Sequence, residues 1–143
     1  MDVERLLEMR FPADPKRLKM VREQVQQAAS GLACPKKLVS DLIIAVNEAC
    51  MNIMEHAYKG DRSGEIVLEI NNNGDLIEVV LTDFASPVDF NTIEPRDIDE
   101  LQPGGLGTFF MRELMDECSY SHLQDRAGNV LRMVKRLVPA SGS

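Results

Sequence analysis

Hydrophobic residues recur along this chain with two different spacings, which separate predicted helices from predicted strands. Between residues 38 and 58 they recur every three or four positions, the period of a helix with one buried face: Leu38, Leu42, Ala45, Val46 and Ala49. Residues 65–71 and 76–82 are instead rich in Ile, Val and Leu, and Asn72-Asn73-Gly74-Asp75 joins them. This turn composition is typical of a tight hairpin, so we expect two adjacent antiparallel strands.

The remaining pattern predicts one more early strand, two further helices and two late strands. The strand 3–11 is followed by Asp14-Pro15, a helix-start signal, and by a helix that ends near Gly31. A third helix is predicted over 106–117, and the closing strands over 118–123 and 129–138. This order favours an α+β fold, an α/β sandwich whose mixed, mainly antiparallel sheet is covered on one face by helices. We expect one domain over residues 1–138 and a frayed tail over 139–143.

Composition and charge exclude several classes of function. The chain has 143 residues, 44% hydrophobic and 27% charged, with a net charge of -7. No apolar run approaches the ~20 residues that cross a bilayer, and the first residues do not resemble a signal peptide, so we expect a cytoplasmic protein. The acidic balance disfavours nucleic acid and anionic membranes as partners. Cys34, Cys50 and Cys118 show no zinc or disulfide spacing and are expected to be packing residues.

Three polar side chains lie four residues apart within the otherwise apolar helix: Glu48, Asn52 and His56. On a helix this spacing places a carboxylate, a carboxamide and an imidazole on one stripe. Such groups are costly in a packed interior unless a ligand or a partner satisfies them. A carboxylate can take a proton from a hydroxyl, an amide oxygen can ligate Mg²⁺, and an imidazole can meet a phosphate. The stripe therefore suggests magnesium-nucleotide chemistry.

The segment Glu48-x-x-x-Asn52-x-x-x-His56-Ala57-Tyr58 resembles the N box of the Bergerat-fold, or histidine-kinase-like, ATPases. Within that superfamily the chain is most similar to the bacterial anti-sigma factor serine/threonine kinases. The likeness runs from about residue 6 to residue 137, with Asp83 at the end of a predicted strand and Gly104-Gly105-Leu106-Gly107 at the start of a predicted helix. It implies a Bergerat fold of the α+β type described above.

The resemblance implies a role for each of these positions. Glu48 would activate the attacking hydroxyl, and Asn52 would ligate Mg²⁺. Asp83 would accept a hydrogen bond from the exocyclic amine of adenine, which guanine lacks at that position. The family commonly has glycine two residues after this aspartate, where this chain has Ala85.

Backbone amides at a helix start would bind the phosphates of ATP, and these come from Gly104, Gly105, Leu106 and Gly107, with the Thr108 hydroxyl beside them. His56 is either a phosphate contact or a satisfied core residue, and Tyr58 is expected to be a packing residue. Many related kinases have an arginine just before the glycine cluster, where this chain has Pro103, and Arg96 is a candidate substitute.

The function implied is that of an ATP- and Mg²⁺-dependent serine/threonine kinase that acts as an anti-sigma factor in a partner-switching module. Its partners would be a STAS-type anti-anti-sigma antagonist, which it phosphorylates, a sigma factor, and a second copy of itself in a homodimer. Residues 84–103 would form a lid over the nucleotide. The main alternative is a non-catalytic module that binds a protein partner, favoured by Ala85, Pro87 and Pro103. A metabolic enzyme with a Glu base is a third class.

Overall fold

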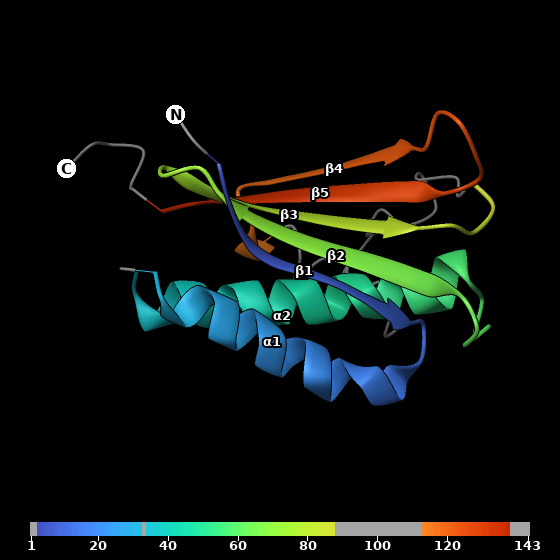
Figure 1. Ribbon diagram of the computed structural model, residues 1–143, viewed down its shortest axis with the longest axis horizontal. Coiled ribbons are helices and arrows are strands. Elements are labelled where there is room, and N and C mark those ends of the chain that lie inside the picture. Colours follow the sequence, from blue (N-terminus) through green and yellow to red (C-terminus); the bar gives the residue numbers. More distant parts are fainter. Residues whose placement is uncertain (1–2, 33, 88–112, 138–143) are drawn as a thin grey trace.

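The computed structural model describes residues 3–32, 34–87 and 113–137, which form a two-layer α/β sandwich (Figure 1). Five strands form one layer: β1 (Glu4–Pro12), β2 (Glu65–Asn72), β3 (Leu76–Asp83), β4 (Glu117–His122) and β5 (Asn129–Arg136). The other layer holds α1 (Leu18–Ser30), preceded by a 3₁₀ turn at Pro15–Arg17, and α2 (Lys36–Asn52), continued by a π-helical turn at Ile53–Ala57. Both helices cover the same face of the sheet.

The strands pair in the order β1-β2-β3-β5-β4, and each of the four pairings among the described residues is antiparallel. The α+β class and the one-sided helix layer are thus confirmed, and the sheet shows no parallel pair within these residues. The predicted hairpin is present: Gly74 adopts φ 97°, and its N–H donates to Asn72 Oδ1 at 2.9 Å. Asn73 Oδ1 accepts from Leu76 N–H at 3.1 Å. Local turn chemistry therefore sets the register of β2 against β3.

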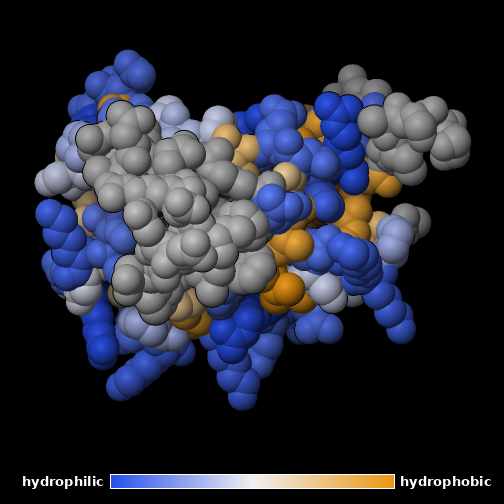
Figure 2. Space-filling model, turned by 180° about the vertical axis from the view of Figure 1, so that it is seen from behind, coloured by the Kyte–Doolittle hydropathy of each residue, from blue (hydrophilic) through white to orange (hydrophobic). Residues whose placement is uncertain are grey.

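Alternation along the strands creates the apolar face that the helices bury. In β3 every second residue is buried, from Ile77 to Asp83, and Leu68 of β2 faces Leu81 across the ladder. The helices contribute residues at helical spacing, including Val21, Val25, Leu42, Val46 and Ala49. On the face seen in Figure 2 most of the described surface is hydrophilic, and hydrophobic residues reach it in a group right of centre. Burial of this shared face holds α2 against the sheet.

A polar contact also holds α2 against the sheet. The buried Asp41 accepts from Lys37 Nζ at 2.9 Å and lies 3.8 Å from Lys135 Nζ on β5. The same Lys135 donates to the carbonyl of Leu114 at 2.6 Å. One lysine thus joins α2, β5 and the residues that precede β4.

Some boundaries differ from those that the sequence predicts. The predicted second helix continues to Tyr58, but its α-helical part ends at Asn52, and the backbone then widens into the π-turn. Glu117, assigned to a helix, begins β4, and β5 ends at Arg136 rather than at residue 138. Most of the predicted third helix and the tail 139–143 lie outside the described residues. Within the described part of the chain, no helix combines the length and apolar character that a membrane crossing requires.

Candidate functional site

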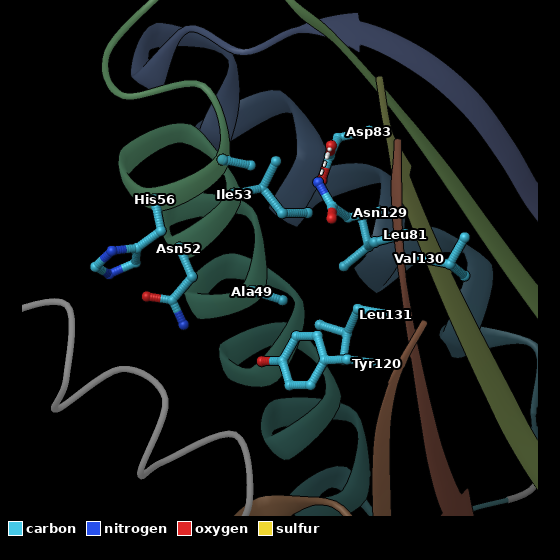
Figure 3. A pocket seen from close by; sticks show the side chains of 11 residues that line it. Ala49, Asn52, Ile53, His56, Leu81, Asp83, Tyr120, Asn129, Val130 and Leu131 are labelled. Atoms are coloured by element: carbon cyan, nitrogen blue, oxygen red, sulfur yellow. Dashed lines mark hydrogen bonds between the residues drawn. The ribbon is translucent and has the colours of Figure 1, made fainter. Parts of the chain in front are cut away.

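Asn52 and His56 lie at the point where α2 changes into the π-turn. Asn52 is the last α-helical residue and is 6% exposed, and His56 is half-buried within the turn. The wider turn is closed by the Tyr58 N–H, which donates to the Ile53 carbonyl at 3.0 Å. The Asn52 and His56 side chains project to the same side of this helix (Figure 3). Asn52 and His56 therefore stay on one side of the helix through the π-turn, and such turns are frequent at functional sites.

Glu48 lies one helical turn before Asn52 on α2 and is half-buried. Burial raises the pKa of its carboxyl group above the ordinary value for glutamate. A raised pKa makes a carboxylate a better proton acceptor once it is ionised, because proton transfer improves as the acceptor's pKa approaches the pH. This environment is compatible with the general-base role that the resemblance implies.

Asp83 ends β3 on the inner face of the sheet and is 2% exposed. Its Oδ1 accepts from Asn129 Nδ2 at 2.9 Å and from the Ala85 backbone N–H at 3.0 Å. Burial raises the pKa of the Asp83 carboxyl group, and the bonds from Asn129 and Ala85 oppose that rise. The carboxylate is therefore held rigidly by its neighbours at the edge of the helix–sheet interface.

Asn52, His56 and Asp83 line one pocket between the helix and the sheet. Its other lining residues are mostly apolar: Ala49, Ile53, Ala57, Leu81, Tyr120, Asn129, Val130 and Leu131. Figure 3 shows Asp83 and Asn129 joined on the sheet side, and Asn52 and His56 on the helix side. Apolar walls with a few convergent polar groups are typical of small-ligand sites. Neither Glu48 nor Ala85 is among the lining residues, although Ala85 contacts Asp83.

The donor set of this pocket fits an adenine nucleotide with Mg²⁺. A flat base suits the apolar walls, and a carboxylate, which has four lone-pair positions, can accept from an amine in addition to its internal donors. Among the described residues no group of three or more His, Cys, Asp or Glu side chains could hold a metal ion. Mg²⁺ differs from such cluster-bound metals, because it keeps several waters and takes only one or two protein ligands when phosphates supply the rest. The amide oxygen of Asn52 is of the chemical type that would serve as such a ligand.

The predicted phosphate-binding residues cannot be placed in the pocket. Gly104, Gly105, Leu106, Gly107 and Thr108 all lie outside the described residues, as do Pro103, Arg96 and most of the predicted lid. Their roles therefore stay predictions.

Among the residues with polar side chains that line the pocket, two were missed by sequence reasoning. Asn129 begins β5, and its Nδ2 also donates to the Ser86 carbonyl at 3.2 Å, so it holds both Asp83 and the chain that follows. Tyr120 of β4 forms part of the wall. Gly128 before Asn129 marks a strand start, but which residue faces Asp83 depends on the register of strands far apart in sequence. That register is not visible in a local pattern.

The chain is similar to a large set of known proteins over most of its length. Residues 11–135 match the family described as "Histidine kinase-like ATPase domain". The chain is 33% identical over 139 residues to the serine-protein kinase RsbW of Bacillus subtilis, an alignment that covers 92% of this chain and 85% of that protein. It is 32% identical over 142 residues to the RsbW of Bacillus pumilus, covering 92% and 86%.

Solved structures show the same fold at lower identity. The structure of the SiaB–SiaC complex from Pseudomonas aeruginosa matches with a TM-score of 0.70 at 19% identity, covering 91% of this chain and 89% of that one. The structure of the RsbU and RsbW domains of Rv1364c from Mycobacterium tuberculosis matches with a TM-score of 0.63 at 16% identity, covering 96% of this chain and 33% of the longer one. With the match over residues 11–135, the chain belongs to the family of histidine kinase-like ATPase domains.

Proposed function

We propose that this protein is an ATP-dependent serine/threonine protein kinase that acts as an anti-sigma factor in a partner-switching module. The observation that carries the proposal is the pocket that joins the helical Asn52 and His56 to the sheet residue Asp83. Sequence identity of 33% to a serine-protein kinase over nearly the whole chain supports the same reading. The substrate would be a serine on a STAS-type anti-anti-sigma antagonist.

In this proposal the sheet side of the pocket recognises the base and the helix side faces the phosphates. Asp83, held by Asn129 and Ala85, accepts a hydrogen bond from the exocyclic amine of adenine. Ala85 continues this edge of the site through its backbone. His56 lies where it can meet a phosphate oxygen, and the backbone amides of residues 104–107 and the Thr108 hydroxyl are assigned to the phosphates by resemblance alone.

Glu48 is proposed as the general base of phosphoryl transfer. It takes the proton from the serine hydroxyl of the partner as the serine oxygen bonds to the γ-phosphorus of ATP. The bond from that phosphorus to the β–γ bridging oxygen breaks, and ADP leaves. Asn52 would hold Mg²⁺, which would neutralise negative charge on the phosphates when bound. The protein itself contributes mainly positioning and a fixed electrostatic environment.

Several wider features belong to the same proposal. Residues 1–138 act as one cytoplasmic domain and associate as a homodimer. The second protein partner is a sigma factor, which is held while the antagonist is phosphorylated. The net charge of -7 favours protein partners over nucleic acid or an anionic membrane.

The test is a radiolabel transfer assay with a candidate antagonist, run beside nucleotide titrations. Glu48→Gln keeps size and helix propensity but cannot take the proton, so ATP should bind while transfer falls about 10²- to 10⁴-fold. Asn52→Ala should weaken Mg²⁺-dependent ATP binding as well as transfer. Glu55→Gln, a matched change at an exposed glutamate in the next turn, should alter neither.

The outcomes separate kinase activity from partner binding. Melting curves show whether each variant is folded. If Glu48→Gln transfers phosphate normally, the base lies elsewhere. If the wild-type protein transfers none to any antagonist yet holds a sigma factor tightly, the kinase proposal is wrong and a non-catalytic binding module is the better description.

A further inference from the structure

A single hydroxyl group, that of Tyr58, connects three segments of the chain, two of which carry residues that line the pocket. It donates to the Glu65 carbonyl at 2.6 Å and accepts from the Phe84 backbone N–H at 2.8 Å. Tyr58 follows the π-turn that carries His56, Glu65 begins β2, and Phe84 comes directly after Asp83. The hydroxyl therefore joins the end of the helix to the start of one strand and to the end of its neighbour.

The Tyr58 ring is fixed in place as firmly as its hydroxyl. It packs so closely on Gly64 that a Cβ added there would lie 2.3 Å from ring atom Cε1. The backbone N–H of Tyr58 closes the π-turn on Ile53, and its ring packs against the hydrophobic core. Packing, as expected from the sequence, is thus one role of Tyr58. Packing alone does not require a hydroxyl with two backbone partners, so the hydroxyl needs its own explanation.

The main chain that the hydroxyl holds is the part that orients Asp83. The Asp83 carboxylate accepts from the Ala85 N–H, and Phe84 lies between these two residues. Phe84 is also covered by Arg126 from the β4–β5 turn, whose guanidinium carbon lies 4.4 Å from the ring centre. The Phe84 N–H therefore lies in the middle of the short segment from Asp83 to Ala85. The backbone geometry of this segment determines the direction of the Asp83 side chain. Displacements of well under 1 Å matter for such a contact.

We propose that Tyr58 is a positioning residue of the nucleotide site: its hydroxyl anchors the backbone at Phe84 and so aims the Asp83 carboxylate at the adenine amine. This inference rests on the proposed function for its ligand. It assigns to Tyr58 a specificity-determining role without contact to the nucleotide. It also links the two sides of the pocket, because the helix turn that carries His56 and the strand end that carries Asp83 share this one anchor.

The hydroxyl is neutral under ordinary conditions, as the anchor requires. Burial raises the pKa of the Tyr58 phenol, the bond from Phe84 lowers it, and the negative charge of Asp83 raises it again. A phenolate would lose the bond that it donates to Glu65. The anchor therefore holds across the neutral pH range.

The test compares the full-length wild type with Tyr58→Phe, which keeps the ring and removes only the hydroxyl. Amide hydrogen exchange in the nucleotide-free protein reports on the anchor, and we expect exchange at Phe84 and Ala85 to rise about tenfold. Titrations with ATP and GTP measure how well the Asp83 carboxylate is positioned for adenine. The affinity of Tyr58→Phe for ATP should be about three- to tenfold lower than that of the wild type, with little change for GTP. In the transfer assay KM for ATP should rise while kcat stays within about twofold.

Two further variants serve as a negative and a positive control. Ser63→Ala removes a hydroxyl from the turn that connects Tyr58 to β2. Among the described residues this hydroxyl bonds only Asp61, so its loss should change none of these readouts. Gly64→Ala keeps the Tyr58 hydroxyl but pushes its ring out of place, so it should reproduce the loss of ATP preference. If Tyr58→Phe is poorly folded, Gly64→Ala replaces it in the test, because it displaces the hydroxyl instead of removing it.

The outcomes distinguish this inference from the function on which it rests. Wild type that binds neither nucleotide overturns the proposed function, and the assignment of Tyr58 with it. Wild type that binds ATP, while Tyr58→Phe keeps both its exchange rates and its ATP-to-GTP ratio, overturns the inference alone. Faster exchange at Phe84 together with a reduced ATP preference supports it.

Discussion

Replacing Asn129 by Ala tests how the structure holds the buried Asp83 carboxylate. The change removes one hydrogen bond to a carboxylate, at 2.9 Å, and one to the Ser86 carbonyl, at 3.2 Å. A bond to a charged group contributes about 1.5–3 kcal/mol and a neutral one about 0.5–1.5 kcal/mol. We therefore expect the free energy of unfolding to fall by about 2–4 kcal/mol. For a domain of this size, the melting temperature should fall by about 2–4 °C for each kcal/mol.

The pH dependence of this loss has a definite sign. Because burial raises the pKa of Asp83 in the folded protein, its contribution to stability is fully present below the ordinary aspartate pKa of about 3.9 and is lost as pH rises through the folded value. The bonds from Asn129 limit that loss. Without them the pKa of Asp83 rises further, so Asn129→Ala should destabilise the protein more at pH 7.5 than near pH 4.

The assay is urea unfolding followed by circular dichroism at both pH values, for the four proteins of a double-mutant cycle with Asp83→Ala. We expect a coupling free energy of at least about 1.5 kcal/mol at pH 7.5. Asn47→Ala is the control, because Asn47 also bonds side chains, Arg22 and Met51, but through solvent-exposed bonds rather than a buried one. A coupling below about 0.5 kcal/mol, or the same loss at both pH values, would refute the reasoning.

Three further predictions follow from single groups. Asp83→Asn should stabilise the nucleotide-free protein at pH 7.5, because it removes a buried charge, yet weaken ATP binding by about 1.5–3 kcal/mol, as measured by calorimetry. Burial raises the pKa of the Cys50 thiol to about 12, so Ellman's reagent at pH 8 should label it only after unfolding in urea. The protein has two tyrosines and no tryptophan, so absorbance at 295 nm should show the Tyr58 phenol titrating above its ordinary pKa of about 10, a step that Tyr58→Phe removes.

The sequence predicted those parts of the fold whose causes are local. The hairpin after β2 follows from Asn72, Asn73 and Gly74, whose side chains and backbone freedom make that turn without help from the rest of the chain. The apolar period predicted a helix over residues 38–58, and α2 covers Lys36–Asn52 of the chain. Nothing in Ile53-Met54-Glu55-His56-Ala57 departs from helical composition, so the π-turn was not predictable. It is accompanied by the tertiary bonds of Tyr58, which a local pattern does not encode.

The candidate site, like the fold, was predicted only in part from the sequence. Asn52, His56 and Asp83 were identified from the sequence, the first two by spacing and the third largely by family resemblance, and the structure brings them to one pocket. Their chemical roles stay predictions. Asn129 was missed because asparagine at a strand start is unremarkable until the strand is known to lie beside β3. Asn129 becomes the partner of the buried Asp83 carboxylate only through the pairing of β3 with β5, strands that are far apart in the sequence.

The strand order has a consequence for how the protein folds. β2 with β3, and β4 with β5, are hairpins that can form from local contacts, whereas β3 pairs with a strand that begins 46 residues after its last residue. Bringing such distant residues together costs chain entropy before any contact repays it, so we expect this pairing to form late. Asp83 and Asn129, 46 residues apart in sequence, face each other at one end of this ladder. The sheet side of the pocket therefore forms only when the two hairpins join, so we expect nucleotide binding to require that pairing.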